Sequence, residues 1–341
     1  MKYFKASLLS YFLPKRLIQV LKFNCALILA IFCGLAYAQN VSNEVWPNRP
    51  IRIITTDPGG AADIAARLIA PSLSKSFGQS VFIDNRSGGG SITAIEAVVS
   101  SNPDGHTLLL YGSPVWLMQL MKSKLSWDPI RDLSPVSLVI TQPNVLAVHP
   151  SLPVKSVQDL ITLARQKPGE LNYSSGSIGA SNHLAAELFN SMAKVKIERI
   201  PYKGGGAALM GVLTNQTQLI FGTTASVKPQ IESGKLRAIA VTTSQPSILL
   251  PGVPTISASG LAGYEALTLY ALFAPSKTPK NIIQLINQEV VKALNRPEVK
   301  QSLMKSGNEA TPSTPEGLAK IIDDDIFRWG KIIREANITV D

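Results

Sequence analysis

Glycine-rich turns are the part of this sequence with the clearest capacity for chemistry. Glycine lets a ligand approach the main chain, and the first N–H groups of a helix point outward from its positive end. Turns of this kind can bind an anion without a charged side chain. Six such turns join apolar runs to the segments that follow: DPGGAAD (57–63), NRSGGGS (85–91), YGSPV (111–115), SSGSIGAS (174–181), YKGGGA (202–207) and FGTTAS (221–226).

One glycine turn could serve only to end a strand. The recurrence of these turns in both halves of the chain favours a cleft lined with N–H donors. In DPGG the main chain would hold the anion, and Ala61 and Ala62 would keep side-chain bulk away from it. Asp63 falls in the first turn of the following helix, where it can cap the helix or accept a bond from a main-chain N–H of the turn.

The histidines do not favour a catalytic triad. We expect His106, in PDGH, at a surface turn, and His149 next to a crossover between lobes. His183 lies in the first turn of a helix, where the positive helix end disfavours protonation, so we expect a neutral hydrogen-bonding residue and not a base. SSGSIG does not match G-x-S-x-G. We predict no catalytic residue and no enzyme; an exported α/β hydrolase acting through Ser175 and His183 is the alternative class.

Metal and nucleotide sites lack their signatures. Asp323, Asp324 and Asp325 form an acidic run within an amphipathic helical pattern. A run of this kind is typical of a solvated helix face, whereas a metal site needs clustered His, Cys or carboxylate ligands. The glycine turns lack both G-K-[ST] and G-x-G-x-x-G. We therefore predict no metal and no cofactor.

Residues 1–38 form a predicted signal peptide. A segment with five basic and no acidic residues precedes the apolar run CALILAIFCGLAYA, which ends in an A-x-A site at Ala36–Ala38. This run has 14 residues, fewer than the roughly 20 of a membrane helix; an uncleaved anchor is the alternative. Cleavage would remove Cys25 and Cys33, so the exported chain would depend on a sizeable core and not on disulfides.

The charge balance says little about partners. The chain carries 33 basic and 23 acidic residues, a net charge of +10, and loss of the five basic residues of the leader leaves +5. The remaining Lys and Arg residues are scattered, without runs or interleaved aromatic residues, so we expect no nucleic-acid partner. A mildly basic exported protein could attract anionic small molecules.

Short apolar runs alternate with helical patterns, which predicts an α/β fold with mostly parallel sheets. The expected strands are 51–55, 81–84, 107–111, 136–140, 144–148, 171–175, 198–202, 217–221 and 236–241. The expected helices are 61–77, 92–100, 157–165, 181–192, 207–214, 226–231, 281–294, 297–305 and 315–336.

Several segments, in this order, carry a family resemblance: WPNRPIRIIT, DPGGAADIAARLIAPSL, NPDGHTLLL, SWDPIRDLSPVSLV, KPGELNYSSGSIGASNHLAAELF, IPYKGGGAAL and SGKLRAIAVTT. The chain resembles the tripartite tricarboxylate transporter receptors, also called Bug-type extracytoplasmic solute receptors, over nearly all of residues 46–341. The resemblance implies a type II periplasmic binding protein with two α/β lobes, each a mostly parallel sheet flanked by helices, and two crossover strands. It places lobe 1 at 46–142 plus 270–341 and lobe 2 at 143–269, with crossovers near Thr141–Asn144 and Ala266–Phe273.

The resemblance further implies that a small organic acid is held in an interlobe cleft, mainly by main-chain amides. Mapping the family pattern together with the turns above gives the candidate ligand-binding residues Asp57, Pro58, Gly59, Gly60, Ala61, Ser113, Ser175, Gly176, Gly179, Ser181, His183, Tyr202, Gly204, Gly222 and Thr223. Tyr202 is the aromatic residue that borders a glycine turn. Tyr270 is expected as a hinge or core residue.

Three departures from the family pattern bear on specificity. The first turn is one residue shorter and lacks an aromatic residue, which allows Asp57 to point at the ligand. Gly222 stands where many members carry Asp, so an amino-acid ligand cannot be inferred from that position. The segment SSGSIGASNHL keeps the small polar character of the facing turn. The ligand class therefore stays broad: a dicarboxylate, an aromatic acid or a related anion.

The implied partners follow from the same resemblance. A periplasmic monomer would bind the carboxylate and present its closed form either to membrane transporter subunits or to a signalling sensor.

Overall fold

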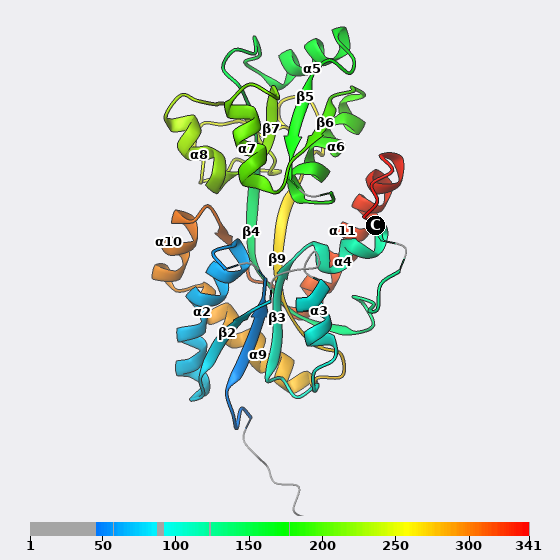
Figure 1. Ribbon diagram of the computed structural model, residues 1–341. Helices are drawn as coiled ribbons and strands as arrows, with labels where there is room; N and C mark the ends of the chain where they lie inside the picture. Colours follow the sequence, from blue (N-terminus) through cyan, green and yellow to red (C-terminus); the bar gives the residue numbers. More distant parts are fainter. Residues whose placement is uncertain (1–45, 57, 87–91, 123, 177, 341) are drawn as a thin grey trace, which may run out of the picture. The chain divides into compact units, whose positions relative to one another are not determined.

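The computed structural model describes residues 46–56, 58–86, 92–122, 124–176 and 178–340 (Figure 1). The predicted signal peptide and Asp57 lie outside these residues. The strands are β1 (Ile51–Thr55), β2 (Val81–Asn85), β3 (Thr107–Gly112), β4 (Leu133–Val148), β5 (Asn172–Ser175), β6 (Glu198–Pro201), β7 (Leu219–Thr223), β8 (Arg237–Val241), β9 (Leu267–Pro275) and β10 (Glu309–Ala310). The helices are α2 (Ala61–Phe77), α3 (Ile92–Val99), α4 (Pro114–Met121), α5 (Val157–Gln166), α6 (Ser181–Ala193), α7 (Gly205–Leu213), α8 (Thr224–Glu232), α9 (Lys280–Leu294), α10 (Pro297–Lys305) and α11 (Pro315–Glu335).

Two groups of strands pair in parallel, as the alternation of strands and helices predicts. β1 lies between β2 and β3, and β5 lies between β6 and β7. Parallel strands end at the same edge of a sheet, where ligands bind in open α/β folds. The turns that follow β1 and β3 therefore share one edge, and those that follow β5, β6 and β7 share another.

Two long strands, β4 and β9, run side by side and antiparallel to each other (Figure 1). Residues Leu133 to Pro143 of β4 pair with β9, and Asn144 to Val148 pair with β7. β4 is thus a single strand, and the prediction of separate strands at 136–140 and 144–148 was wrong. Pro143 interrupts the apolar pattern in the sequence, but it lies where β4 exchanges one partner strand for another, a place where a missing N–H is tolerated.

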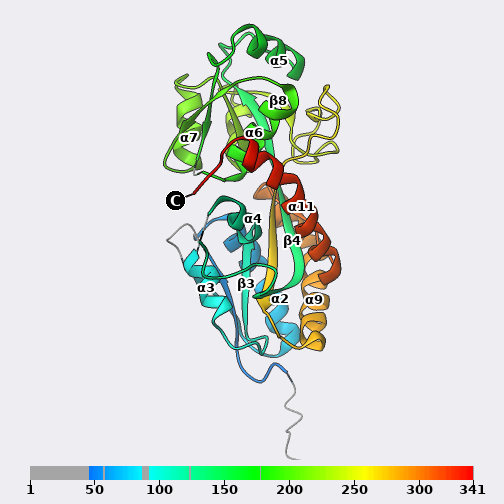
Figure 2. The same ribbon diagram turned by 90° about the vertical axis from the view of Figure 1, so that its right-hand side faces the viewer.

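The helices cover the sheet with their apolar faces. α2 has the predicted bounds and packs against β1, β2, β3 and α9 through a face that includes Ala65 and Ile69. α9 and α11 both pack along β4 (Figure 2). α11 also contacts α4, which follows β3, and α6, which follows β5. This last helix therefore packs against helices connected to both groups of parallel strands.

α4 is a helix that was not predicted from the sequence. Its residues, PVWLMQLM, are apolar except for Gln119, so they give no amphipathic pattern, and Pro114 looked like part of a turn. In the structure Pro114 occupies the first helical turn, where its lack of an N–H is harmless. Trp116 of α4 is fully buried, with its ring centroid 6.1 Å from that of Phe273.

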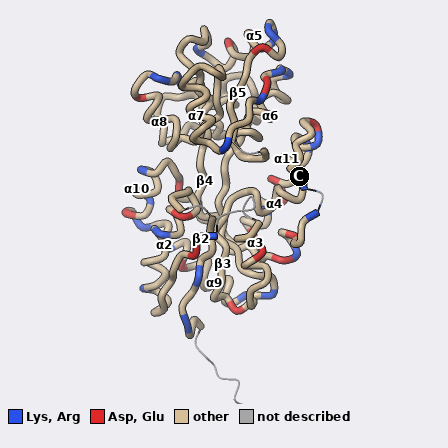
Figure 3. The backbone as a smooth tube through the Cα atoms, viewed as in Figure 1, with Lys and Arg blue, Asp and Glu red and all other residues tan. Residues whose placement is uncertain are grey.

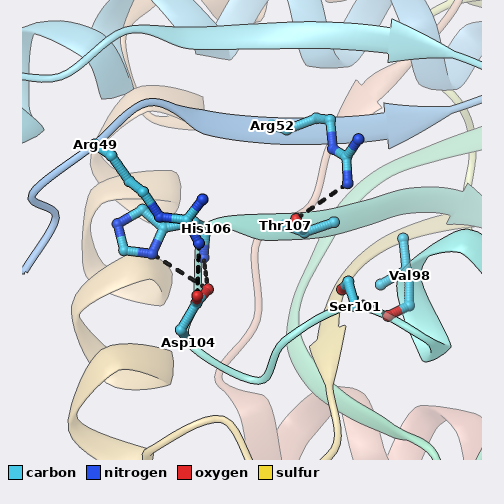
Figure 4. A network of polar contacts seen from close by, with 7 residues as sticks. All are labelled: Arg49, Arg52, Val98, Ser101, Asp104, His106 and Thr107. Carbon is cyan, nitrogen blue, oxygen red and sulfur yellow. Dashed lines mark hydrogen bonds and ion pairs between the residues drawn. The ribbon is translucent and has the colours of Figure 1, made fainter.

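His106 lies in a polar network before β3 and is only 5% exposed, so its prediction as a surface turn residue was wrong (Figure 4). Its Nδ1 is 3.2 Å from Asp104 Oδ1, and Arg49 Nη2 is 2.7 Å from Asp104 Oδ2. The network joins the segments that enter β1 and β3, so it lies at the amino ends of these strands. It stabilises the edge of the sheet that is opposite the edge with the glycine turns.

Residues 47–341 form one compact unit by their internal contacts. Within the part of the chain that the structure describes, no helix has the length and apolar character to cross a bilayer.

Candidate functional site

The turn between β1 and α2 is held by Asp63. Gly59 has a positive φ of 77°, and its N–H donates to Asp63 Oδ2 at 2.9 Å. Asn85 Nδ2 donates both to Asp63 Oδ1 at 2.9 Å and to the Thr56 carbonyl at 2.8 Å. The prediction that Asp63 bonds back to the turn is confirmed.

The Asp63 carboxylate is buried at 3% exposure and pairs with Arg67. Burial alone would raise its pKa, but hydrogen bonds from Arg67, Gly59 and Asn85 hold the pKa below its ordinary value. Because the Gly59 N–H is already engaged, Gly59 shapes the turn and is not a donor to a ligand. The donors that remain here belong to the start of α2, where Gly60 is the N-cap in an extended conformation and Ala61 begins the helix.

The turn between β5 and α6 has the same design with a different side chain. Gly179 has φ of 72°, and its N–H donates to His183 Nδ1 at 3.0 Å. His183 is 6% exposed, and burial, followed by the charge of Arg199, lowers its pKa to about 4. His183 is therefore neutral at pH 7, as predicted, and the bond that Nδ1 accepts from Gly179 places its proton on Nε2. Its role is to fix the turn, and the Gly179 N–H, like that of Gly59, is not offered to a ligand.

Arg199 of β6, which the sequence analysis did not single out, lies beneath this turn. Its Nε donates to Ser175 Oγ at 2.6 Å and its Nη2 to the Gly176 carbonyl at 2.8 Å. Ser175 is fully buried, and its hydroxyl oxygen accepts from a guanidinium, so it is poorly placed to act as an activated nucleophile. Arg199 pairs with Tyr173 between β6 and β5, and this pairing, which the sequence alone does not give, is what places Arg199 near the turn.

The turn after β6 packs closely on the turn after β5. A Cβ on Gly176 would lie 3.2 Å from the Gly204 carbonyl carbon and the Gly205 nitrogen, so a side chain there would be crowded by main chain. The Gly204 N–H donates to the Tyr202 carbonyl. Tyr202 does not line the cavity described below: its ring covers Gly211 of α7, and its hydroxyl donates to Gln216 Oε1 at 3.2 Å.

Gly222 is buried in β7 opposite Val145, and Thr223 forms the N-cap of α8. A Cβ on Gly222 would clash with Val227 Cγ1, so a side chain such as the Asp that the family resemblance implies there would need Val227 to move. Thr223 Oγ1 bonds to Ser226 Oγ at 3.0 Å.

A cavity of about 190 Å³ lies where α4 and α6 begin and β9 passes between them. Three of the candidate residues, Ser113, Gly179 and Ser181, line it; the other described candidates do not. Its walls are Tyr111, Gly112, Ser113, Pro114, Leu117, Gly179, Ala180, Ser181, Leu184, Ala266, Leu267, Thr268, Tyr270 and Trp329. The N-terminus of α6, with Ala180 as an extended N-cap, therefore opens onto the cavity.

Asp325 does not line the cavity but is hydrogen-bonded to Trp329, which does. Trp116 Nε1 donates to its Oδ2 at 2.7 Å, and Trp329 Nε1 donates to its Oδ1 at 2.8 Å. Asp323 and Asp324 are exposed, as expected for a solvated run, but Asp325 is buried, and for this residue the prediction was wrong. Burial raises its pKa to about 6 despite the two indole N–H donors.

Charged side chains lie outside the cavity. Figure 3 shows Lys and Arg interspersed with Asp and Glu over the described helices and loops, without a continuous basic stripe. Among the described residues, no group of three His, Cys, Asp or Glu side chains could hold a metal ion. The arrangement offers main-chain N–H groups and small hydroxyls beside an apolar space, which suits recognition of a small anion.

Comparisons with known proteins show the family to which the chain belongs. The model of the tripartite tricarboxylate transporter family receptor matches residues 65–338. Protein BugT of Bordetella pertussis is 35% identical over 313 residues, which cover 90% of this chain and 96% of that protein. The structure of R. palustris Rpa4515 with adipate has a TM-score of 0.75 at 34% identity, covering 86% of this chain and 99% of that one.

MatC (Rpa3494) from Rhodopseudomonas palustris, with bound malate, has a TM-score of 0.70 at 28% identity over 84% of this chain and all of that one. The α/β fold of a periplasmic binding protein, predicted from the sequence, is thereby confirmed. The chain belongs to the tripartite tricarboxylate transporter receptor family, a family of periplasmic solute receptors.

Proposed function

We propose that this protein is a periplasmic receptor that binds a small carboxylate through main-chain N–H groups and delivers it to membrane transporter subunits. The observation that carries the proposal is the matched pair of turns before α2 and α6. In each, a glycine N–H is bonded to a side chain four residues later, which fixes the turn and leaves the first helical N–H groups pointing outward. Donors fixed before the ligand arrives lose little entropy on binding.

The relatives support a small carboxylate as the ligand. One solved relative holds adipate and another malate, both small carboxylates. The family description supplies the transporter as partner.

We further propose that the α2 turn belongs to one lobe (46–142 plus 270–341) and the α6 turn to the other (143–269). β4 and β9 support this division, because both run through the proposed boundaries. A ligand that contacts both lobes would stabilise their closed arrangement, and only such differential contact can shift the population of closed receptor.

Gly60→Val tests the proposal by crowding the start of α2. Gly60 has φ of −71°, which valine can adopt, so the fold should survive with a modest loss of stability. The branched side chain should block approach to the Ala61 and Ala62 N–H groups. Gly60→Ala is the matched control, since its single methyl adds little bulk.

We expect calorimetry with a panel of small mono- and dicarboxylates to show at least a tenfold loss of affinity in Gly60→Val and a small change in Gly60→Ala. Unchanged affinity in Gly60→Val, with a normal melting temperature, would place the anion elsewhere.

A further inference from the structure

We propose that the cavity between α4, α6 and β9 holds the uncharged body of the ligand, so that the preferred ligand is a monocarboxylate carrying a six-membered ring and not a dicarboxylate. This inference rests on the proposed function and narrows its ligand class.

The walls of the cavity are suited to an apolar group. Leu117 comes from α4, Leu184 from α6 and Trp329 from α11, with tyrosines 111 and 270 beside them. Among the described residues, the lining includes no Lys, Arg, His, Asp or Glu side chain. An ionised group transferred to such a space without a paired charge is strongly disfavoured.

Asp325 makes a second carboxylate still less favourable. The Trp329 indole N–H already donates to Asp325, so it is not available to a ligand oxygen. The Asp325 carboxyl group lies directly behind this part of the wall, where its negative charge would repel an anion.

The size of the cavity suits one ring. Its volume is about 190 Å³, and an apolar protein cavity of ~150 Å³ is large enough to bind benzene. Aromatic walls add favourable ring-to-ring contact when the rings are offset or edge-on.

Thr268 brings a buried hydroxyl without a hydrogen-bond partner among the described residues to the wall of the cavity. Its side chain is 8% exposed. Thr268 lines the cavity together with Leu267 and Tyr270 of β9 and with Ala266, which directly precedes this strand. Together with the N-terminus of α6, this hydroxyl can receive one oxygen of the carboxylate that, under the proposed function, the start of α2 also holds, with the ring directed toward the leucines.

The experiment measures binding of benzoate, cyclohexanecarboxylate, adipate and malate to the signal-free chain by calorimetry and thermal shift. We expect the two ring monocarboxylates to bind at least tenfold more tightly than the two dicarboxylates. Tighter binding of adipate or malate would overturn the inference and leave the proposed function intact. Failure of all four acids to bind would count against the inference and the proposed function together.

Thr268→Val locates the site, because it replaces the hydroxyl by a methyl group of the same shape. We expect a roughly tenfold loss of benzoate affinity with an unchanged or higher melting temperature, since a buried hydroxyl without a partner does not stabilise the free protein. Thr217→Val is the matched control: Thr217 is fully buried, its Oγ1 also lacks a partner among the described residues, and it does not line the cavity. Equal benzoate affinity in Thr268→Val and Thr217→Val would contradict the assignment.

Discussion

The turns before α2 and α6 have the same geometry but differ in the charge of the side chain that holds them. In each, a glycine with positive φ is followed by an extended N-cap, and the glycine N–H donates to the side chain four positions on. That side chain is the acid Asp63 in one turn and the neutral His183 in the other. The sequence has no close internal repeat, so the likeness lies in the backbone and not in the residues.

The difference shows where an anion should be held more strongly. The negative charge of Asp63 is balanced by Arg67, which leaves little net charge at the first turn. The second turn has a neutral acceptor, and Arg199 lies beneath it. The α6 turn therefore has the more positive surroundings, and it is also the turn that opens onto the cavity.

The largest effect we expect is acid destabilisation through His183. Its folded pKa of about 4 lies below the ordinary 6.5, so the unfolded chain takes up a proton between these values and the folded chain does not. Stability from this group is complete above pH 6.5 and is lost as the pH falls toward 4, by about 3 kcal/mol. His183→Asn keeps an acceptor for Gly179 and removes the titration. Urea unfolding at pH 7 and pH 4 should show wild type losing more stability than the variant; parallel losses would contradict this.

Asp325 should give a slightly smaller effect of the opposite sign. Its folded pKa of about 6 lies above the ordinary 3.8, so the folded chain holds the proton more tightly. Stability is then highest below pH 3.8 and falls as the pH rises toward 6, by on the order of 2–3 kcal/mol. This pH dependence of stability runs opposite to that from His183 and partly cancels it. The difference in stability between wild type and Asp325→Asn, measured at each pH, isolates the contribution of Asp325. If the difference in stability between wild type and Asp325→Asn does not change with pH, the pKa of Asp325 is not raised in the folded protein.

Removing the acid of the first turn should cost about 2 kcal/mol. Asp63→Ala leaves the Gly59 N–H without its acceptor and deprives Asn85 of one partner. Asp63→Asn retains an acceptor and should be milder. Since the pKa of Asp63 is lowered, its contribution is present above its ordinary pKa and is lost as the pH falls below it. Equal free energies of unfolding for the Ala and Asn variants at pH 7 would show that the Gly59 bond is unimportant.

The smallest effect belongs to Arg67, whose side chain is 55% exposed. Its ion pair with Asp63 should contribute little to stability because water and salt screen it. Arg67→Gln should nevertheless make the first turn more negative and weaken carboxylate binding there at low salt. If binding to this variant matches wild type in 20 mM and in 200 mM salt, the first turn does not sense the anion electrostatically.

Local patterns predicted much of the fold but not its long-range contacts. α2 has the bounds expected from its periodicity and its flanking glycines, whereas α4 was missed because a helix with a single polar residue carries no periodic signal. The sequence indicated the glycine turns, since glycine is needed at Gly59 and Gly179 for a positive φ. It did not indicate Asn85, Arg199 or Thr268, because their positions depend on strands that are paired in space and separated along the chain.

Burial was the other property that the sequence did not supply. Asp325 belongs to a run that looks solvated throughout, and only the packing of α11 on α4 brings it between two tryptophans.

Amide NMR during titration with benzoate and with adipate tests the central claim most directly. If main-chain N–H groups hold the carboxylate, the amide protons of Ala61, Ala62, Ser181 and Asn182 will move downfield and exchange more slowly with solvent. Those of Gly59 and Gly179, already bonded within the turns, will change little. Saturable binding that shifts only Arg or Lys side-chain resonances, with all four helix-start amides unmoved, would contradict the account.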